Sequence, residues 1–169
     1  LLIESIREPN PVVFFAALML LGKKGDVPEG AYSIEFGKAD VKREGTDVTV
    51  VAIGSTVPQA LEVADQLAET GVSVEVIDPR TLVPFDWDAV AKSVSKTGRL
   101  VAVDPNRETC GAASEIITQA VERCWSQLKA QPQRVTWPNV PMPYSPPLEK
   151  AVVSDLDDIR RAIELTLKS

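Results

Sequence analysis

Residues 47–80 constrain the fold more than any other stretch, because they carry the pattern of a strand, a helix and a second strand. The runs DVTVVAI and VSVEVI are short and rich in β-branched residues, as expected for strands covered on both faces. Between them, apolar residues recur at the i, i+3, i+4 spacing of one helical face, namely Val57, Ala60, Leu61, Ala64, Leu67 and Ala68. Gly71 stands where a helix C-cap belongs. We therefore predict a right-handed crossover between two parallel strands.

The chain after residue 80 continues the same alternation. Asp86 is placed to cap a helix that ends at Gly98, RLVAVDP predicts a third parallel strand, and a long helix is expected over residues 111–130. QRVTW at residues 133–137 predicts a fourth strand, and a fifth is expected near residues 151–153. The predicted fold class is α/β: a doubly wound, mostly parallel sheet of about five strands with helices on both faces.

The C-terminal part combines a proline-rich run with a final helix. PNVPMPYSPPLEK is expected to be an ordered loop, because its prolines lack the N–H groups that helices and central strands need. Ser154 followed by Asp157 resembles a capping box and predicts the start of the last helix. The apolar stripe of that helix consists of Leu156, Ile159, Ile163 and Leu167.

The N-terminal part predicts a remnant of another domain followed by a linker. Residues 1–8 have the pattern of the last turns of a helix, and PVVFF predicts a buried strand paired with another element, because an exposed strand of this type promotes aggregation. Residues 22–45 are rich in Gly, Pro and charge and predict an extended linker. A chain that begins within an apolar helical pattern is expected to be a piece of a longer protein.

Composition and charge argue against several classes of function. The net charge is −6 without a long lysine or arginine cluster, which argues against nucleic-acid binding and favours a basic protein partner. The chain contains no run of 18 apolar residues, so no membrane-spanning helix is predicted. The chain has two cysteines and no histidine, which argues against most zinc sites and the usual Ser/His and Cys/His catalytic pairs. Cys124 is expected in the core, and Cys110 precedes a helix without a histidine to activate it.

Polar residues at the ends of the first two predicted strands are candidate site residues. Gly54, Ser55 and Thr56 lie between a strand and a helix, where backbone N–H groups can hold an anion, and Asp78 ends the next strand as a ribose-binding acid would. The remaining glycines of a dinucleotide fingerprint are absent, so a helix start and a turn acid are the favoured interpretation of these residues. Asp78 is also a candidate ion-pair partner of Arg80.

The acidic residues at the start of the last helix have two interpretations. Asp155, Asp157 and Asp158 crowd its first turn, where the helix dipole favours carboxylates. They are either a solvated helix start or an acidic docking patch.

The order of the motifs resembles a known family more closely than any single motif does. LLIESIREPNPVVFF, GKADVKREGTDVTVVAIGS, VEVIDPRTLVPFD, KTGRLVAVDP and VPMPYSPPLEK follow one another as in the C-terminal half of the beta subunit of thiamine-diphosphate-dependent 2-oxoacid dehydrogenases. The relatives are the decarboxylase components of the pyruvate, branched-chain 2-oxoacid and acetoin types, in the transketolase-like group. The resemblance covers essentially the whole chain.

This resemblance implies a division of the chain and a set of partners. Residues 1–21 correspond to the end of the pyrimidine-binding domain, residues 22–45 to the linker and residues 46–169 to the transketolase-like C-terminal domain. Thiamine diphosphate and Mg²⁺ are expected to be bound mainly outside this chain, so the chain alone is expected to be inactive. The implied partners are an alpha subunit, a second beta subunit and the acyltransferase core, in the cytoplasm or the mitochondrial matrix. A stand-alone nucleotide-binding module and a protein-interaction module are the alternatives.

The resemblance also implies a potassium site and two departures from the family pattern. Some members bind K⁺ through a loop that matches SIREPN, with oxygens from the positions of Ser5, Glu8 and Asn10, and further ligands are expected from outside this chain. An ordinary helix-to-strand turn is an equally good interpretation of this loop. Ala16 and Ala17 follow the FF pair where relatives usually have an acidic residue and then His, Asp or Pro. The loop NRETCG lacks the histidine and Gly-Gly pair of many relatives, so it does not identify the substrate.

Overall fold

The computed structural model describes residues 1–168 and contains one five-stranded sheet. The strands are β1 (Asp40–Arg43), β2 (Val48–Ala52), β3 (Val74–Asp78), β4 (Leu100–Arg107) and β5 (Gln133–Trp137). Their order is β1-β3-β2-β4-β5, with β1 antiparallel to β3 and the other neighbours parallel. The helices are α1 (Leu2–Arg7), α2 (Thr56–Ala68), α3 (Trp87–Thr97), α4 (Ala112–Cys124), α5 (Pro146–Val152) and α6 (Leu156–Leu167), with short 3₁₀ turns at Leu18–Leu20 and Trp125–Gln127.

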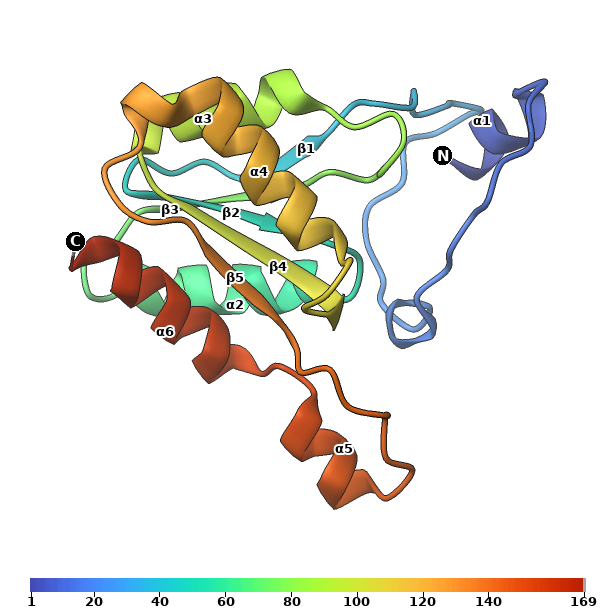
Figure 1. Cartoon of the computed structure of the whole chain (residues 1–169). Helices are drawn as coiled ribbons and strands as arrows, with labels where there is room; N and C mark the ends of the chain where they lie inside the picture. Colours follow the sequence, from blue (N-terminus) through green and yellow to red (C-terminus); the bar gives the residue numbers. More distant parts are fainter. Residues whose placement is uncertain (169) are drawn as a thin grey trace.

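Helices cover both faces of the sheet, which confirms the predicted doubly wound α/β fold (Figure 1). One buried cluster joins α2 and α6 to the side chains of Val50, Val76 and Val103, and the other joins α3 and α4 to those of Val51 and Ile77. Successive residues of a strand therefore point into opposite clusters, as the pleat requires. All five residues of β2 are buried, which explains the continuous apolar run in its sequence.

The predicted limits of α3 are confirmed by its caps. The Asp86 carboxylate accepts a hydrogen bond from the backbone N–H of Ala89 at 3.1 Å, and Gly98 ends the helix with φ of 74°. A left-handed backbone of this kind suits glycine, because it carries no Cβ. The helix predicted over residues 111–130 is shorter, since α4 ends at Cys124 and a 3₁₀ turn follows.

The fifth strand lies at a different place from the one predicted. Residues 151–153 are the end of α5 and its C-cap, whereas β1 lies within the stretch predicted as an extended linker and pairs with β3, with Asp40 opposite Asp78. Three of the four residues in DVKR are charged, which suits an edge strand with two exposed residues. Residues 40–43 therefore belong to the sheet and not to a linker.

The proline-rich segment also contains a helix that was not predicted. Pro146 and Pro147 occupy the first turn of α5, where the missing N–H groups would have no partner within the helix. The capping box of α6 is shifted by one residue from the prediction: the Asp155 carboxylate accepts from the backbone N–H groups of Asp157 and Asp158, and Asp158 accepts from that of Asp155.

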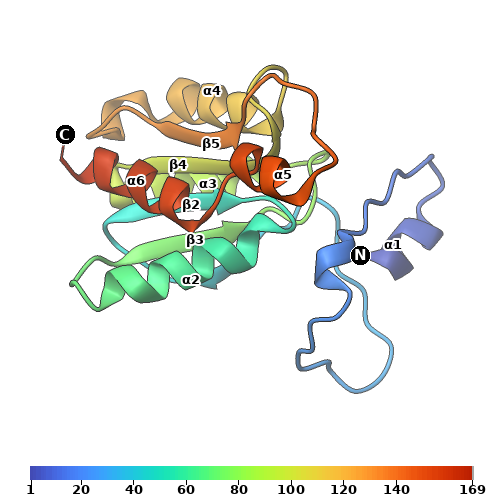
Figure 2. The ribbon, with the colours of Figure 1, turned by 90° about the horizontal axis from the view of Figure 1, so that it is seen from below.

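The prediction of a buried strand at PVVFF was wrong for this chain. Residues 11–17 have no regular structure, and the exposed fractions of Val13 and Phe15 are 77% and 89%. Figure 2 shows α1 and the following segment to one side of the sheet, beyond the carboxyl ends of its parallel strands. A strand forms only where a neighbour supplies ladder bonds and cover, and no strand within residues 1–168 pairs with this one.

None of the helices in residues 1–168 has both the length and the apolar character needed to cross a membrane.

Candidate functional site

The loops that follow the parallel strands gather at one edge of the sheet, which is where α/β folds place their ligand and partner contacts. This carboxyl edge consists of residues 53–56 after β2, residues 79–86 after β3, residues 104–111 at the end of β4 and residues 138–145 after β5. Because the loops come from neighbouring strands, side chains distant in sequence meet there.

The loop after β3 is fastened to the segment that precedes β1. The backbone N–H of Gly37 donates to the Thr81 hydroxyl at 3.0 Å, and that of Ala39 donates to Asp86 Oδ2 at 2.9 Å. Asp86 therefore uses one carboxylate oxygen to cap α3 and the other to hold residue 39. Asp86 thus joins the start of α3 to the segment that precedes β1.

Arg80 is the most constrained residue of this loop. Its φ of 59° lies in the left-handed region, which is unusual for a residue other than glycine. Its guanidinium donates to Asp40 Oδ2 at 2.6 Å, whereas Asp78 accepts only from the Arg80 backbone N–H, at 3.0 Å. The predicted ion pair between Asp78 and Arg80 was therefore wrong about the partner, because β1 brings Asp40 to the arginine.

Asp40 and Asp78, which lie opposite each other in the β1–β3 pair, have pKa values shifted in opposite directions. Burial by itself raises the pKa of Asp40, but the hydrogen bond from Lys42 and the positive charge of Arg80 outweigh it and hold the pKa below its usual value. Burial dominates at Asp78 and raises the pKa of that carboxyl. Asp40 and Asp78 are thus neighbours in the β1–β3 strand pair but have different electrostatic surroundings.

Thr56 and Asp78, two of the four residues that suggest nucleotide binding, are engaged within the chain. The Thr56 hydroxyl accepts from the backbone N–H of Ile53 at 3.1 Å and donates to the Ile53 carbonyl at 2.9 Å. Asp78 accepts from its own turn. Thr56 and Asp78 therefore fix two strand ends, which agrees with their interpretation as a helix start and a turn acid.

The loop at the end of β4 is fastened to the loop after β5. The backbone N–H of Glu108 donates to the Trp137 carbonyl at 2.9 Å, and the Asn139 amide donates to Glu108 Oε1 at 3.1 Å. The Arg107 guanidinium donates to the Val140 carbonyl at 3.2 Å. These bonds hold two adjacent loops as one ordered surface.

One of the two cysteines is buried, as predicted, and the other is exposed. Cys124 is buried against α3, with its thiol 3.7 Å from the Ala91 carbonyl, which confirms its place in the core. Cys110 is exposed just before α4 and has φ of 61°.

The three residues predicted for potassium binding are only partly brought together. The Asn10 side-chain amide donates to Glu8 Oε1 at 2.6 Å, but the Ser5 hydroxyl donates to the Leu1 carbonyl at 3.0 Å. Their oxygens suit a hard cation chemically, whereas this arrangement places only two of the three side chains side by side. Within residues 1–168 there is no group of three or more His, Cys, Asp and Glu side chains that would hold a metal ion.

Large apolar side chains are exposed at the carboxyl edge. Val83 and Tyr144 have exposed fractions of 92% and 101%. Leu82, Val140 and Met142 are exposed beside them in the same loops. A concentration of exposed apolar side chains on ordered loops is typical of an interaction surface.

Comparison with known proteins places these features in one family. The family model described as "Transketolase, C-terminal domain" matches residues 37–159. The chain is 43% identical over 168 residues to the acetoin:2,6-dichlorophenolindophenol oxidoreductase subunit beta of Cupriavidus necator, which covers 99% of this chain and 50% of that protein. It is 41% identical over 146 residues to the pyruvate dehydrogenase E1 component subunit beta of Bacillus subtilis, covering 86% of this chain and 45% of that protein.

A solved structure gives the same result. The structure titled "Split gene transketolase, inactive beta4 tetramer" matches with a TM-score of 0.67 and 26% identity, covering 85% of this chain and 46% of that one. The chain thus spans about half the length of the curated relatives it matches.

Proposed function

The chain belongs to the transketolase C-terminal domain family, and from this premise we propose that it is the C-terminal part of the beta subunit of a thiamine-diphosphate-dependent 2-oxoacid dehydrogenase. In this proposal the complete enzyme decarboxylates a 2-oxoacid and passes the acyl group to a lipoyl group of an acyltransferase. The observation that carries the proposal is the alignment with an oxidoreductase beta subunit along 99% of this chain at 43% identity.

The part played by this chain is assembly and docking. Its carboxyl edge exposes Val83 and Tyr144 on loops that are held by the Thr81, Asp86 and Glu108 hydrogen bonds. Ordered apolar loops suit a permanent contact with neighbouring subunits, because little conformational entropy is lost when they bind. The proposed partners are an alpha subunit, a second beta subunit and the acyltransferase core, in the cytoplasm or the mitochondrial matrix.

The domain division follows from the same proposal with one adjustment. Residues 1–21 are the end of a pyrimidine-binding domain and residues 22–36 are the linker, and the C-terminal domain starts at residue 37, where the family match begins, because β1 belongs to its sheet. The exposed PVVFF segment is then covered by the rest of its own domain in the complete protein.

The cofactor is assigned outside this chain. Thiamine diphosphate supplies the carbanion chemistry when it is bound, and Mg²⁺ takes oxygen ligands, the phosphate oxygens of the cofactor among them. We assign no cofactor ligand to these residues. Ser5, Glu8 and Asn10 are proposed to contribute to a potassium site only together with oxygens from the rest of the protein.

A chimeric subunit tests the proposal. Residues 1–169 replace the matching half of the Cupriavidus necator beta subunit, and the chimera is produced with the alpha subunit of that enzyme. We expect a stable complex that consumes acetoin with 2,6-dichlorophenolindophenol only when thiamine diphosphate and Mg²⁺ are added. A chimera that folds, as judged by circular dichroism, but neither binds the alpha subunit nor turns over acetoin would contradict the proposal.

Two matched substitutions locate the docking surface. Val83→Asp places a charge on the carboxyl edge, and Trp125→Asp places one on an apolar side chain that is 73% exposed beyond the other end of α4. We expect the first to weaken complex formation at least tenfold and the second to leave it within twofold. Equal effects of the two would remove the carboxyl edge from the proposal.

A further inference from the structure

Strand β5 forms an open edge of the sheet, because within residues 1–168 it pairs with β4 alone. The Trp137 carbonyl accepts a hydrogen bond from the backbone N–H of Glu108, so the backbone N–H and C=O of Trp137 point toward β4. The N–H and C=O of one strand residue point to the same side and those of the next residue to the other. The backbone groups of Arg134 and Thr136 therefore point outward and are ready to pair with a further strand.

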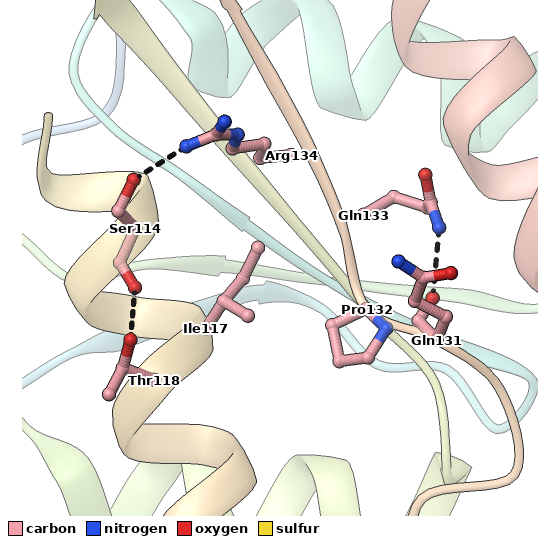
Figure 3. Close-up of a pocket in the computed structure, with 7 residues that line it drawn as sticks. All are labelled: Ser114, Ile117, Thr118, Gln131, Pro132, Gln133 and Arg134. Atoms are coloured by element: carbon pink, nitrogen blue, oxygen red, sulfur yellow. Dashed lines mark hydrogen bonds between the residues drawn. The ribbon is translucent and has the colours of Figure 1, made fainter. Parts of the chain in front are cut away.

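A hollow lies beside this edge on the α4 side of the sheet (Figure 3). It measures about 430 Å³ and lies between one face of α4 and the start of β5. Its lining consists of Ser114, Ile117, Thr118, Gln131, Pro132, Gln133 and Arg134. The hollow is thus largely polar and carries one charged side chain.

A second hollow of about 470 Å³ lies on the other face, between β5 and the start of α6. Its lining includes the apolar side chains of Val135, Val153 and Ala162. Val135 is buried in the α2–α6 cluster, which fixes that side chain on the face opposite to Arg134. Thr136, Asp158 and Arg161 line the same hollow, so the open edge is flanked by two hollows that both carry polar and charged side chains.

The charge of Arg134 is only weakly compensated. Its guanidinium donates to the Ser114 hydroxyl at 2.8 Å and to the Glu108 carbonyl at 3.0 Å, which are neutral acceptors. The carboxylate paired with it is that of Glu108, at 4.0 Å. A carboxylate that entered the polar hollow would meet this guanidinium and the Ser114 hydroxyl, and hydrogen bonds between charged groups are stronger than those between neutral ones.

We propose that the β5 edge binds an extended peptide segment of a partner protein whose acidic side chains enter the α4-side hollow beside Arg134. Pairing with the outward groups of Arg134 and Thr136 supplies the affinity, and the guanidinium of Arg134 selects acidic side chains. This inference is independent of the proposed enzyme function, since it rests on the open edge and the charge of Arg134.

A second copy of this chain fits the same edge less well. In an antiparallel pair of two β5 strands centred on Val135, the two Arg134 side chains would lie diagonally on one face, where like charges repel. Pro132 and Pro138 also flank the strand and limit the length available for self-pairing. Charge complementarity therefore favours an acidic partner.

Titration of the ¹⁵N-labelled chain with two synthetic peptides tests the proposal. The probe is acetyl-Val-Glu-Val-Glu-Val-amide, and its control replaces both Glu by Gln. We expect saturable shifts of the Arg134 and Thr136 amide signals with the Glu peptide and at least tenfold weaker binding of the Gln peptide. Absence of saturable shifts at millimolar Glu peptide would overturn the proposal, as would self-association, seen by sedimentation, that protects these two amides.

Three substitutions separate the parts of the proposal. Thr136→Pro removes an outward N–H without touching the β4 ladder, and we expect it to weaken binding of the Glu peptide at least tenfold. Arg134→Gln should reduce the preference for the Glu peptide to less than twofold while the amide shifts remain, so this variant tests the charge even if the proline variant fails to fold. Arg161→Gln removes an arginine from the α6-side hollow and should leave the preference unchanged; an equal loss in this variant would refute the role of Arg134.

Discussion

The buried carboxylate of Glu75 offers a quantitative test of how the fold is stabilised. Its side chain is 3% exposed in β3, and it accepts hydrogen bonds from the backbone N–H of Gly45 at 3.1 Å and from the Lys96 ammonium of α3. Lys96 is 40% exposed, so the pair joins a buried group to a partly solvated one. Lys96→Met keeps much of the side-chain volume and removes the charge.

The expected loss follows from the burial of the two partners. Removing one member of a fully buried pair costs about 3–5 kcal/mol, whereas exposed pairs contribute about 0–1 kcal/mol. Because solvent screens Lys96 and the Gly45 hydrogen bond remains, we expect Lys96→Met to lower the free energy of unfolding by about 2 kcal/mol at pH 7. The exposed Lys92 of the same helix is the matched control, and Lys92→Met should cost less than about 0.5 kcal/mol.

The loss should depend on pH with a defined sign. Burial by itself raises the pKa of Glu75, but the hydrogen bonds from Lys96, Ser93 and Gly45 outweigh it and hold the pKa below its usual value. A lowered folded-state pKa gives stability that is present above the unfolded pKa and is lost as the pH falls through the folded value. The hydrogen bond to Glu75 raises the pKa of Lys96, so its contribution is fully present at pH 7. The difference between the wild type and Lys96→Met should therefore shrink as the pH falls below about 4.3.

Urea denaturation followed by circular dichroism measures these quantities in a double-mutant cycle. We expect Lys96→Met to cost at least about 1 kcal/mol less in the Glu75→Gln background than in the wild type. An equal cost in both backgrounds, or an equal cost at pH 7 and at pH 3.5, would refute the coupling and leave lost packing as the cause.

Three pairs of substitutions test local features by the same denaturation assay. Asp155→Ala should lower the free energy of unfolding by about 1 kcal/mol, because it removes the cap of α6. Ser154→Ala should be neutral or stabilising, since the buried Ser154 hydroxyl has no partner within residues 1–168. A larger loss for Ser154→Ala than for Asp155→Ala would instead support the capping box predicted from the sequence. Gly45→Ala should cost at least about 2 kcal/mol, because a Cβ there would lie 2.2 Å from the Glu75 backbone nitrogen. A Cβ at Gly25 would meet nothing within 4 Å, so the control Gly25→Ala should be neutral. Similar stabilities of the two variants would contradict the close approach at Gly45. Arg80→Gly should be more stable than Arg80→Ala by about 1 kcal/mol, because only glycine adopts a φ of 59° without strain, and a more stable alanine variant would refute that strain.

The central part of the fold was predictable because its patterns depend on neighbours close in sequence. The runs that became β2 and β3 are buried on both faces, and the stripe between them packs as expected in α2. Asp86 and Gly98 marked the limits of α3 by residue type alone. These elements carry their own boundaries, so no distant contact was needed to place them.

The edges of the fold were harder to predict for a physical reason. Strand β1 has two exposed residues and only one neighbour, so its DVKR sequence resembles a linker. Helix α5 begins with two prolines, which fit the first turn of a helix. In the sequence the same prolines favour the prediction of a loop, because proline disrupts the interior of a helix. PVVFF has the composition of a buried strand, but within residues 1–168 no strand pairs with it.

The carboxyl edge shows how β1 determines what the sequence alone could not give. Asp78 and Arg80 flank one proline and suggest an ion pair, yet the arginine binds Asp40, which is 40 residues away and becomes a neighbour only because β1 joins the sheet. The same addition brings Ala39 to Asp86 and so fastens the loop after β3. A motif that looks like a strand end and a helix cap is therefore half of a junction, and the other half lies in the stretch that the sequence presents as a linker. Deleting residues 37–43 should consequently disorder the loop that exposes Val83 while leaving the α2–α6 side of the core intact.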